Sequence, residues 1–195
     1  TFTGNAIGLD YLRPNNNTPP GVGVAGAQPV GAFIAAGSGA QFGTHPVGTT
    51  GAWANNRSTA VLRIPAGATV LHAELIWGGT YQLGNQATLT TTTRNGAVDF
   101  ITPSGTNAVT PDAATAQEAG NYYVRSQNVT GIVQALGTGA ISISVGKIPA
   151  LNGGSANNTN AADPGGGNSG GWTLAVAYKD TTKEEHKMNI YVGAE

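Results

Sequence analysis

The sequence predicts an all-β fold, namely a two-sheet antiparallel β-sandwich of jelly-roll type with one short helix. Apolar and polar residues alternate with a period of two in several short runs, most clearly over residues 70–77. Helical periodicity is rare, whereas a parallel α/β fold needs a helix after nearly every strand. With 195 residues, the chain fits one sandwich domain spanning residues 1–195.

The expected strands are short runs rich in β-branched or aromatic residues and bounded by Gly, Pro or Asn. They are 59–64, 70–77, 86–93, 97–102, 122–126, 140–145, 171–179 and 188–192, with weaker candidates at 2–9 and 30–35.

Two turn predictions accompany these strands. Arg94-Asn95-Gly96 is expected to join 86–93 and 97–102 as a hairpin, because Asn-Gly favours a tight primed turn. Gly78-Gly79 is expected to end the strand 70–77. Strict alternation in that strand places Leu71, Ala73, Leu75 and Trp77 on one face, and His72, Glu74 and Ile76 on the other.

One helix of about two turns is predicted near residue 130. Its apolar residues follow the spacing i, i+3, i+4 and i+7, and they are Val129, Ile132, Val133 and Leu136. Asn128 or Ser126 can cap its start, and Gly137 stands where a helix ends. We expect this helix to cover one end of the β core.

Two low-complexity stretches, residues 14–26 and 152–171, contain too few apolar residues to order themselves by burial. We expect both to be long surface loops, which either bind a partner or connect strands passively. Residues 1–12 precede the first loop and are strand-like, so they are a candidate donor or edge strand. The chain starts at Thr1 without Met and stops soon after a strand-like run, which indicates a piece of a longer protein.

Charge is sparse in this sequence. Charged residues make up 10% of the chain, compared with roughly 25% in a typical soluble domain. The net charge is −1 and the basic residues are scattered, which argues against a nucleic-acid partner. No apolar stretch is long enough to insert into a membrane, and there is no cysteine. A surface of hydroxyls and amides is typical of extracellular β-proteins.

Several segments together resemble the N-terminal domain of Bacillus-type Gram-positive surface proteins, which usually continue into tandem conserved immunoglobulin-like repeats of unknown function. The segments are 1–5 (TFTGN), 71–79 (LHAELIWGG), 122–126 (YYVRS) with 128–130 (NVT), 171–178 (GWTLAVAY) and 188–193 (MNIYVG). The resemblance implies an adhesin-like or fibre-forming protein on the cell or spore surface. It carries no catalytic signature, and the repeats are absent from this sequence.

Four residues are candidate ligand contacts. His72 and Glu74 lie on the same face of one predicted strand, about 7 Å apart by strand geometry, although such a pair often only lines a wet sheet face. Trp53 and Tyr81 fall in predicted loops and are candidates for stacking on a sugar. We assign no catalytic residue, because no nucleophile stands in a recognisable motif beside a base.

Calcium is the one metal for which the loops offer oxygen ligands. The candidates are Asp112, Glu118 and Asp163, although no Asp-x-Asp-x-Asp run accompanies them. No other cofactor is expected.

The sequence therefore leaves three candidate functions. The first is a non-enzymatic extracellular domain for adhesion or ligand binding, with a glycan or a host or matrix protein as its partner. The second is a structural subunit of an extracellular fibre or spore appendage, which self-associates when residues 1–12 add a strand to a neighbour. The third is a carbohydrate-active enzyme that uses Glu74.

Overall fold

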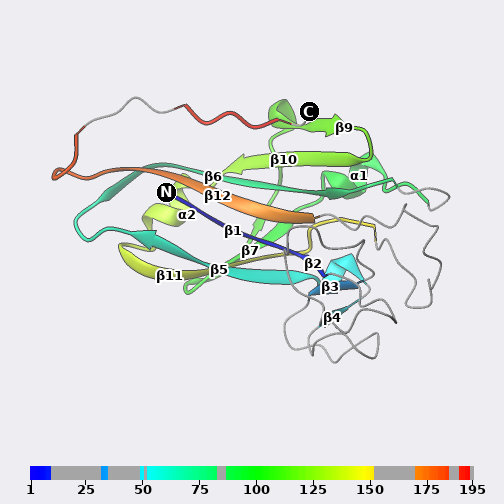
Figure 1. Cartoon of the computed structure of the whole chain (residues 1–195), viewed down its shortest axis with the longest axis horizontal. Coiled ribbons are helices and arrows are strands. Elements are labelled where there is room, and N and C mark those ends of the chain that lie inside the picture. Colours follow the sequence, from blue (N-terminus) through cyan, green and yellow to red (C-terminus); the bar gives the residue numbers. More distant parts are fainter. Residues whose placement is uncertain are drawn as a thin grey trace, which may run out of the picture.

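The computed structural model describes residues 1–9, 32–34, 49–50, 52–82, 87–151, 170–184 and 189–193. Two antiparallel sheets pack face to face as a sandwich (Figure 1). The larger sheet has five strands in the order β1 (Phe2–Ala6), β12 (Gly170–Lys179), β6 (Thr69–Thr80), β10 (Tyr122–Asn128) and β9 (Gln117–Ala119). The smaller sheet has the order β5 (Arg57–Ile64), β11 (Gly139–Gly146), β7 (Val98–Thr102) and β8 (Gly105–Val109). The predicted antiparallel sandwich is confirmed, and its jelly-roll connectivity stays a prediction.

The core fills the space between these two sheets. The five-stranded sheet contributes Leu75, Trp77, Tyr123, Trp172 and Leu174, and the four-stranded sheet contributes Leu62, Phe100, Ile141, Ile143 and Val145. Trp77 and Trp172 lie directly opposite each other on neighbouring strands. The Trp172 indole N–H donates across the sandwich to the Ser58 hydroxyl at 2.9 Å, which joins β12 to β5.

The strand predictions for β5, β6, β10, β11 and β12 are confirmed, and β6 differs from its prediction in two ways. It runs through Gly78-Gly79 to Thr80, so these glycines do not end it. A Cβ at Gly78 would overlap the Tyr123 carbonyl oxygen of β10, so this glycine allows the two strands to approach. Leu71 has no partner in β12, because the register shifts there, and this bulge leaves its side chain 59% exposed.

The predicted hairpin across Arg94-Asn95-Gly96 is wrong. Residues 91–94 form helix α1 (Thr91–Arg94), with the Thr90 hydroxyl accepting the Thr93 N–H at 3.2 Å. The Arg94 side chain is buried against β9, and that tertiary contact overrides the turn preference of Asn-Gly. β7 pairs instead with β8, a strand that the sequence analysis missed.

Helix α2 (Thr130–Gln134) confirms the predicted helix, although it is shorter than expected. The Asn128 side chain accepts the Thr130 N–H at 2.9 Å, and Gly137 takes a φ of +76° just beyond the last turn. α2 packs on β6, where Gln134 donates to the Val70 carbonyl at 2.9 Å. The prediction of a single helix missed α1 and two 3-10 turns, η1 (Trp53–Asn55) and η2 (Ala113–Thr115).

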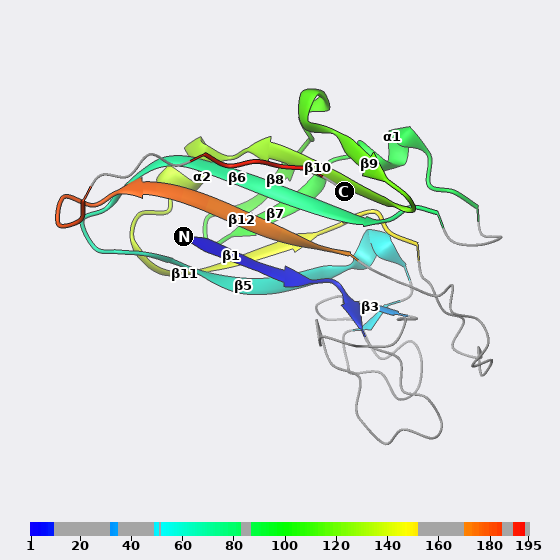
Figure 2. The same cartoon turned by 45° about the horizontal axis from the view of Figure 1, so that its top comes forward.

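Three short strands, β2 (Gly8–Leu9), β3 (Ala32–Ile34) and β4 (Thr49–Thr50), form a small third sheet. The weak strand predictions 2–9 and 30–35 are therefore confirmed in part. The predicted strand 188–192 is wrong over its described residues, since 189–192 carry no strand pairing and lie over the outer face of the five-stranded sheet (Figure 2). The predicted loop 14–26 lies outside the described residues, as does 152–169, while residues 170 and 171 already belong to β12.

Candidate functional site: the acceptor edge for strand β1

Strand β1 lies along the outer edge of β12 in antiparallel register, from Phe2 opposite Ala175 to Ala6 opposite Gly171. Two backbone hydrogen bonds bracket the pairing, from Val176 N–H to Thr1 O at 2.8 Å and from Ile7 N–H to Gly170 O at 3.0 Å. Both cartoon views show β1 running along β12 on the side that faces β5 (Figures 1 and 2). The first strand of the chain therefore completes one edge of the larger sheet.

β1 also reaches the edge strand of the smaller sheet through two side chains. The Thr3 hydroxyl donates to the Val61 carbonyl at 2.9 Å, and the Asn5 amide donates to the Thr59 carbonyl at 2.8 Å. These carbonyls belong to the edge of β5 that does not pair with β11. Since unpaired edge groups favour adventitious strand pairing, β1 protects both sheets at once.

We call the β12 edge from residue 170 to 176, together with the Thr59 and Val61 carbonyl groups, the acceptor edge. Glycines on both sides bring β1 unusually close to it. A Cβ at Gly4 would overlap the Trp172 carbonyl oxygen, and a Cβ at Gly171 would lie 2.9 Å from the Asn5 carbonyl oxygen. Just beyond β1, the Ile7 side chain is fully buried in the core. The acceptor edge therefore fits β1 through backbone, side-chain and core contacts together.

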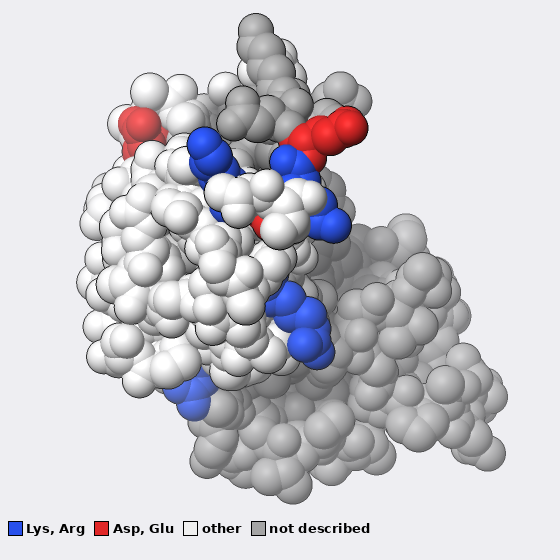
Figure 3. Space-filling model, turned by 90° about the vertical axis from the view of Figure 1, so that its left-hand side faces the viewer, with Lys and Arg blue, Asp and Glu red and all other residues white. Residues whose placement is uncertain are grey.

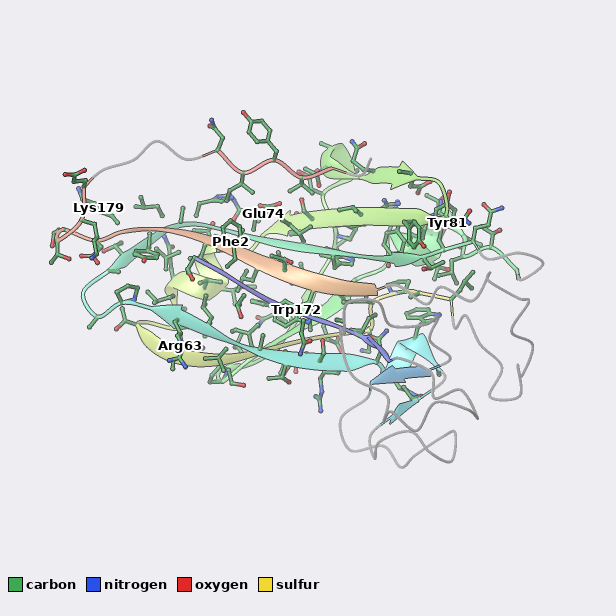
Figure 4. The ribbon with its side chains drawn as sticks, in the orientation of Figure 1. Phe2, Arg63, Glu74, Tyr81, Trp172 and Lys179 are labelled. Atoms are coloured by element: carbon green, nitrogen blue, oxygen red, sulfur yellow. The ribbon has the colours of Figure 1, made fainter. Side chains whose placement is uncertain are left out.

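The predicted pair His72 and Glu74 does come together on β6. Their nearest side-chain atoms, Nε2 and Oε2, are 3.4 Å apart, and the Asn128 amide lies 3.4 Å from the other imidazole nitrogen. The Glu74 side chain is only 12% exposed, on the face over which residues 189–193 run (Figures 2 and 4). His72 therefore already contacts the Asn128 side chain, and the Glu74 carboxylate has limited access to an external ligand.

Both aromatic candidates are half-buried and pack against the core. Trp53 lies in the 3-10 turn η1. Tyr81 follows β6, its hydroxyl donates to the Gly120 carbonyl at 3.1 Å, and the Arg94 guanidinium lies 4.2 Å above its ring. The Tyr81 ring is therefore already stacked within the chain on one face.

The metal candidates are not gathered into one site. The Asp112 carboxylate caps η2 by accepting the Ala114 N–H at 2.8 Å. Glu118 accepts from Arg94 at 3.0 Å and from Arg125 at 2.9 Å, and these two positive charges argue against it as a calcium ligand. Asp163 lies outside the described residues. Within the part of the chain that the structure describes, no three His, Asp or Glu side chains form a metal-binding group. The calcium site stays a prediction that Asp112 and Glu118 do not support.

The cluster around Glu118 was not expected from the sequence. Arg125 is 2% exposed and donates to Glu118, to the Asn95 side chain at 2.8 Å and to the Gln117 carbonyl at 3.0 Å. It thereby ties β10 to β9 and to the end of α1. The only available signal was that a chain with nine Lys and Arg residues places one of them inside the strand pattern 122–126.

This cluster has a predictable response to acid. The hydrogen bond from Arg125, assisted by Arg94, holds the pKa of Glu118 below its ordinary value of 4.5. A lowered pKa in the folded state stabilises the folded chain at pH values above 4.5, and this contribution is lost as the pH falls through the folded-state pKa. We expect Glu118→Gln to have a lower free energy of unfolding than the parent chain at neutral pH. We expect this difference to disappear in acid. Urea unfolding at a series of pH values measures this difference in the free energy of unfolding. Glu184→Gln is the baseline for the loss of one exposed carboxylate. A difference between Glu118→Gln and the parent chain that persists unchanged below pH 4.5 contradicts the prediction.

The outer face of the four-stranded sheet is a second surface of interest, because uncharged residues form its centre, between Arg57 and the Asp99–Lys147 ion pair at one end and Arg63 at the other. Its residues Thr59, Ser144, Ile101 and Thr106 form one row across four strands, with Val61 and Ser142 beside them. The Thr59 and Ser144 hydroxyls are hydrogen-bonded at 2.7 Å. We call these six residues the neutral face. Uncharged surface also dominates the described part of the sandwich end shown in Figure 3.

Comparison of the chain with protein-family models, curated proteins and solved structures finds no match. The resemblance to Gram-positive surface proteins therefore stays a prediction from the sequence. In the described residues, no helix is long and apolar enough to span a membrane.

Proposed function

We propose that this chain is a non-enzymatic structural domain of an extracellular surface assembly, in which β1 of one copy occupies the acceptor edge of the next. The observation that carries the proposal is the way β1 is held. Its backbone pairs with β12, and Thr3 and Asn5 hydrogen-bond to β5, both far from β1 in the sequence. A β1 strand from another copy could make the same contacts, so exchange between copies costs little contact energy.

Two further features support the proposal. The chain is poor in charge, so copies do not repel one another strongly. The resemblance drawn from the sequence implies a fibre-forming or adhesin-like protein displayed on a cell or spore surface. Phe2, on the outer face of β1, is 67% exposed and is available for further contacts between copies.

Cysteine cross-linking between copies tests the exchange, since the chain has no cysteine of its own. The hydrogen-bonding pattern makes Phe2 and Ala175 a non-hydrogen-bonded pair, whose Cα atoms are expected about 4.5 Å apart, a spacing that a disulfide bridges. We expect a mixture of Phe2→Cys and Ala175→Cys chains, concentrated and mildly oxidised, to form covalent dimers that contain one chain of each kind.

The matched control pairs Phe2→Cys with Ser142→Cys, an exposed position on the outer face of β11. Collision between copies favours the Ser142→Cys mixture, because Ser142 is exposed and Ala175 is fully buried, whereas exchange of β1 raises the yield only for the Ala175→Cys mixture. A yield of mixed dimers in the Ala175→Cys mixture that does not exceed the yield in the Ser142→Cys mixture, under conditions where the parent chain is fully folded, would overturn the proposal.

Adhesion or ligand binding is the second candidate, and the neutral face favours it. An uncharged patch of hydroxyl and aliphatic side chains suits a neutral partner such as a glycan better than a charged polymer. A chain that fails the exchange test and is retained on a glycan or matrix-protein array supports this second candidate.

A further inference from the structure

The acceptor edge restricts the residue type of the bound strand most strongly at the position of Gly4. The backbone of Gly4 does not have a positive φ, so its conformation alone does not require glycine. The requirement comes from proximity, because a Cβ there would overlap the Trp172 carbonyl oxygen and lie 3.0 Å from the Thr173 Cα. Both of these are backbone atoms of a central pairing and cannot move aside easily. Any strand with a side chain at this position must lie further from β12.

The positions on either side of Gly4 demand short hydrogen-bond donors. Thr3 and Asn5 project toward β5 and satisfy the Val61 and Thr59 carbonyls. Asn5 also accepts the N–H of Ala6 at 2.8 Å, which fixes the direction of its amide group. An apolar side chain at either position would leave a β5 carbonyl without its partner.

The fourth demand is an aliphatic side chain at the position of Ile7. Ile7 is fully buried in the hydrophobic core, and it lies so close to β12 that a Cβ at Gly170 would be 2.8 Å from its Cδ1 atom. Glycine at 170 therefore makes room for a branched side chain at 7. A small or polar residue at 7 would leave a cavity or an unsatisfied polar group.

We infer that the acceptor edge selects the strand that it binds by the amino-acid sequence of that strand. It accepts the segment Thr3–Ile7 (Thr-Gly-Asn-Ala-Ile) from this chain or a second copy of it. It excludes strands that lack glycine at the second of these positions. The inference rests on the proposed function only where the bound strand comes from a second copy, since the same contacts select β1 within one chain. Exchange, where it takes place, is thereby restricted to copies of this protein.

An intrachain disulfide measures how firmly β1 is docked, and it does not depend on exchange. In a chain that carries both Phe2→Cys and Ala175→Cys, the effective concentration of the disulfide in glutathione redox buffer reports the docking equilibrium. We expect Gly4→Ala to lower it at least about tenfold, Ile7→Ala more than about thirtyfold and Asn5→Ala about fivefold. Gly131→Ala is the matched control, because an added Cβ there meets nothing within 4 Å.

Near-ultraviolet circular dichroism of the tryptophans verifies that each variant is folded. Asn5→Ala keeps the test valid if Gly4→Ala or Ile7→Ala unfolds, since Asn5 is only partly buried and its loss removes the hydrogen bond to β5. Effective concentrations for Gly4→Ala and Asn5→Ala equal to that of Gly131→Ala would overturn the inference. Sequence-dependent docking within one chain, combined with no mixed dimers in the cross-linking experiment, would overturn the exchange proposal alone.

Discussion

Replacing Leu75 with alanine is expected to lower the free energy of unfolding by about 2–5 kcal/mol, whereas Leu71→Ala lowers it by less than about 0.5 kcal/mol. Both leucines lie on β6, four residues apart, and simple alternation places them on the same face. The bulge at Leu71 separates them, because Leu75 is fully buried while Leu71 is 59% exposed. The chemical change is identical, so the difference isolates the effect of burial.

Urea unfolding of the two variants measures this difference, provided that the denaturant dependence of the free energy is the same in both. Similar destabilisation by the two substitutions would mean that Leu71 is buried and that β6 is regular, which would contradict the described register with β12.

The second large effect is expected at Arg125. Arg125→Met should destabilise the chain by about 2 kcal/mol or more, because it leaves the Asn95 side chain and the Gln117 carbonyl without the buried, charged donor that they share. Methionine keeps much of the length of the side chain, so the loss reports mainly on the polar contacts. The Tyr123 ring, 5.2 Å from the guanidinium, also loses its cation contact.

Arg63→Met is the matched control, because the Arg63 side chain is exposed at the end of β5 (Figure 4). Its substitution should change the stability by less than about 0.5 kcal/mol. Thermal and urea unfolding of both variants test this pair, and a loss below about 1 kcal/mol for Arg125→Met would contradict the structural role of the cluster.

The strands were predictable wherever a period-two pattern coincided with β-branched residues, as in β5 and β11. Prediction was wrong at Arg94-Asn95-Gly96, where a strong local turn signal lost to a contact with Glu118, 24 positions away. β8 was missed because its sequence, Gly-Thr-Asn-Ala-Val, has little strand propensity of its own and depends on pairing with β7.

The candidate sites divide in the same way. The meeting of His72 and Glu74 could be predicted, since two residues on one strand need only the strand geometry. The strand-like N-terminus was also visible, whereas its partner β12 was not, because nothing in residues 1–9 identifies a strand near the other end of the chain. The fit of Gly4 to the Trp172 carbonyl depends on that pairing and was therefore beyond sequence analysis.

The pairing of Thr1 with Val176 joins residues 175 positions apart in the chain. At translation rates of 5–20 residues per second, roughly 10–35 s pass between the emergence of the first strand and that of its partner from the ribosome. During that interval the N-terminal segment has no place in its own nascent chain, and pairing across such a distance is slow even after release. If copies exchange β1 as we propose, strands from other newly made copies would compete with the chain's own first strand during this delay, so the ratio of linked to single copies should depend on the rate of synthesis.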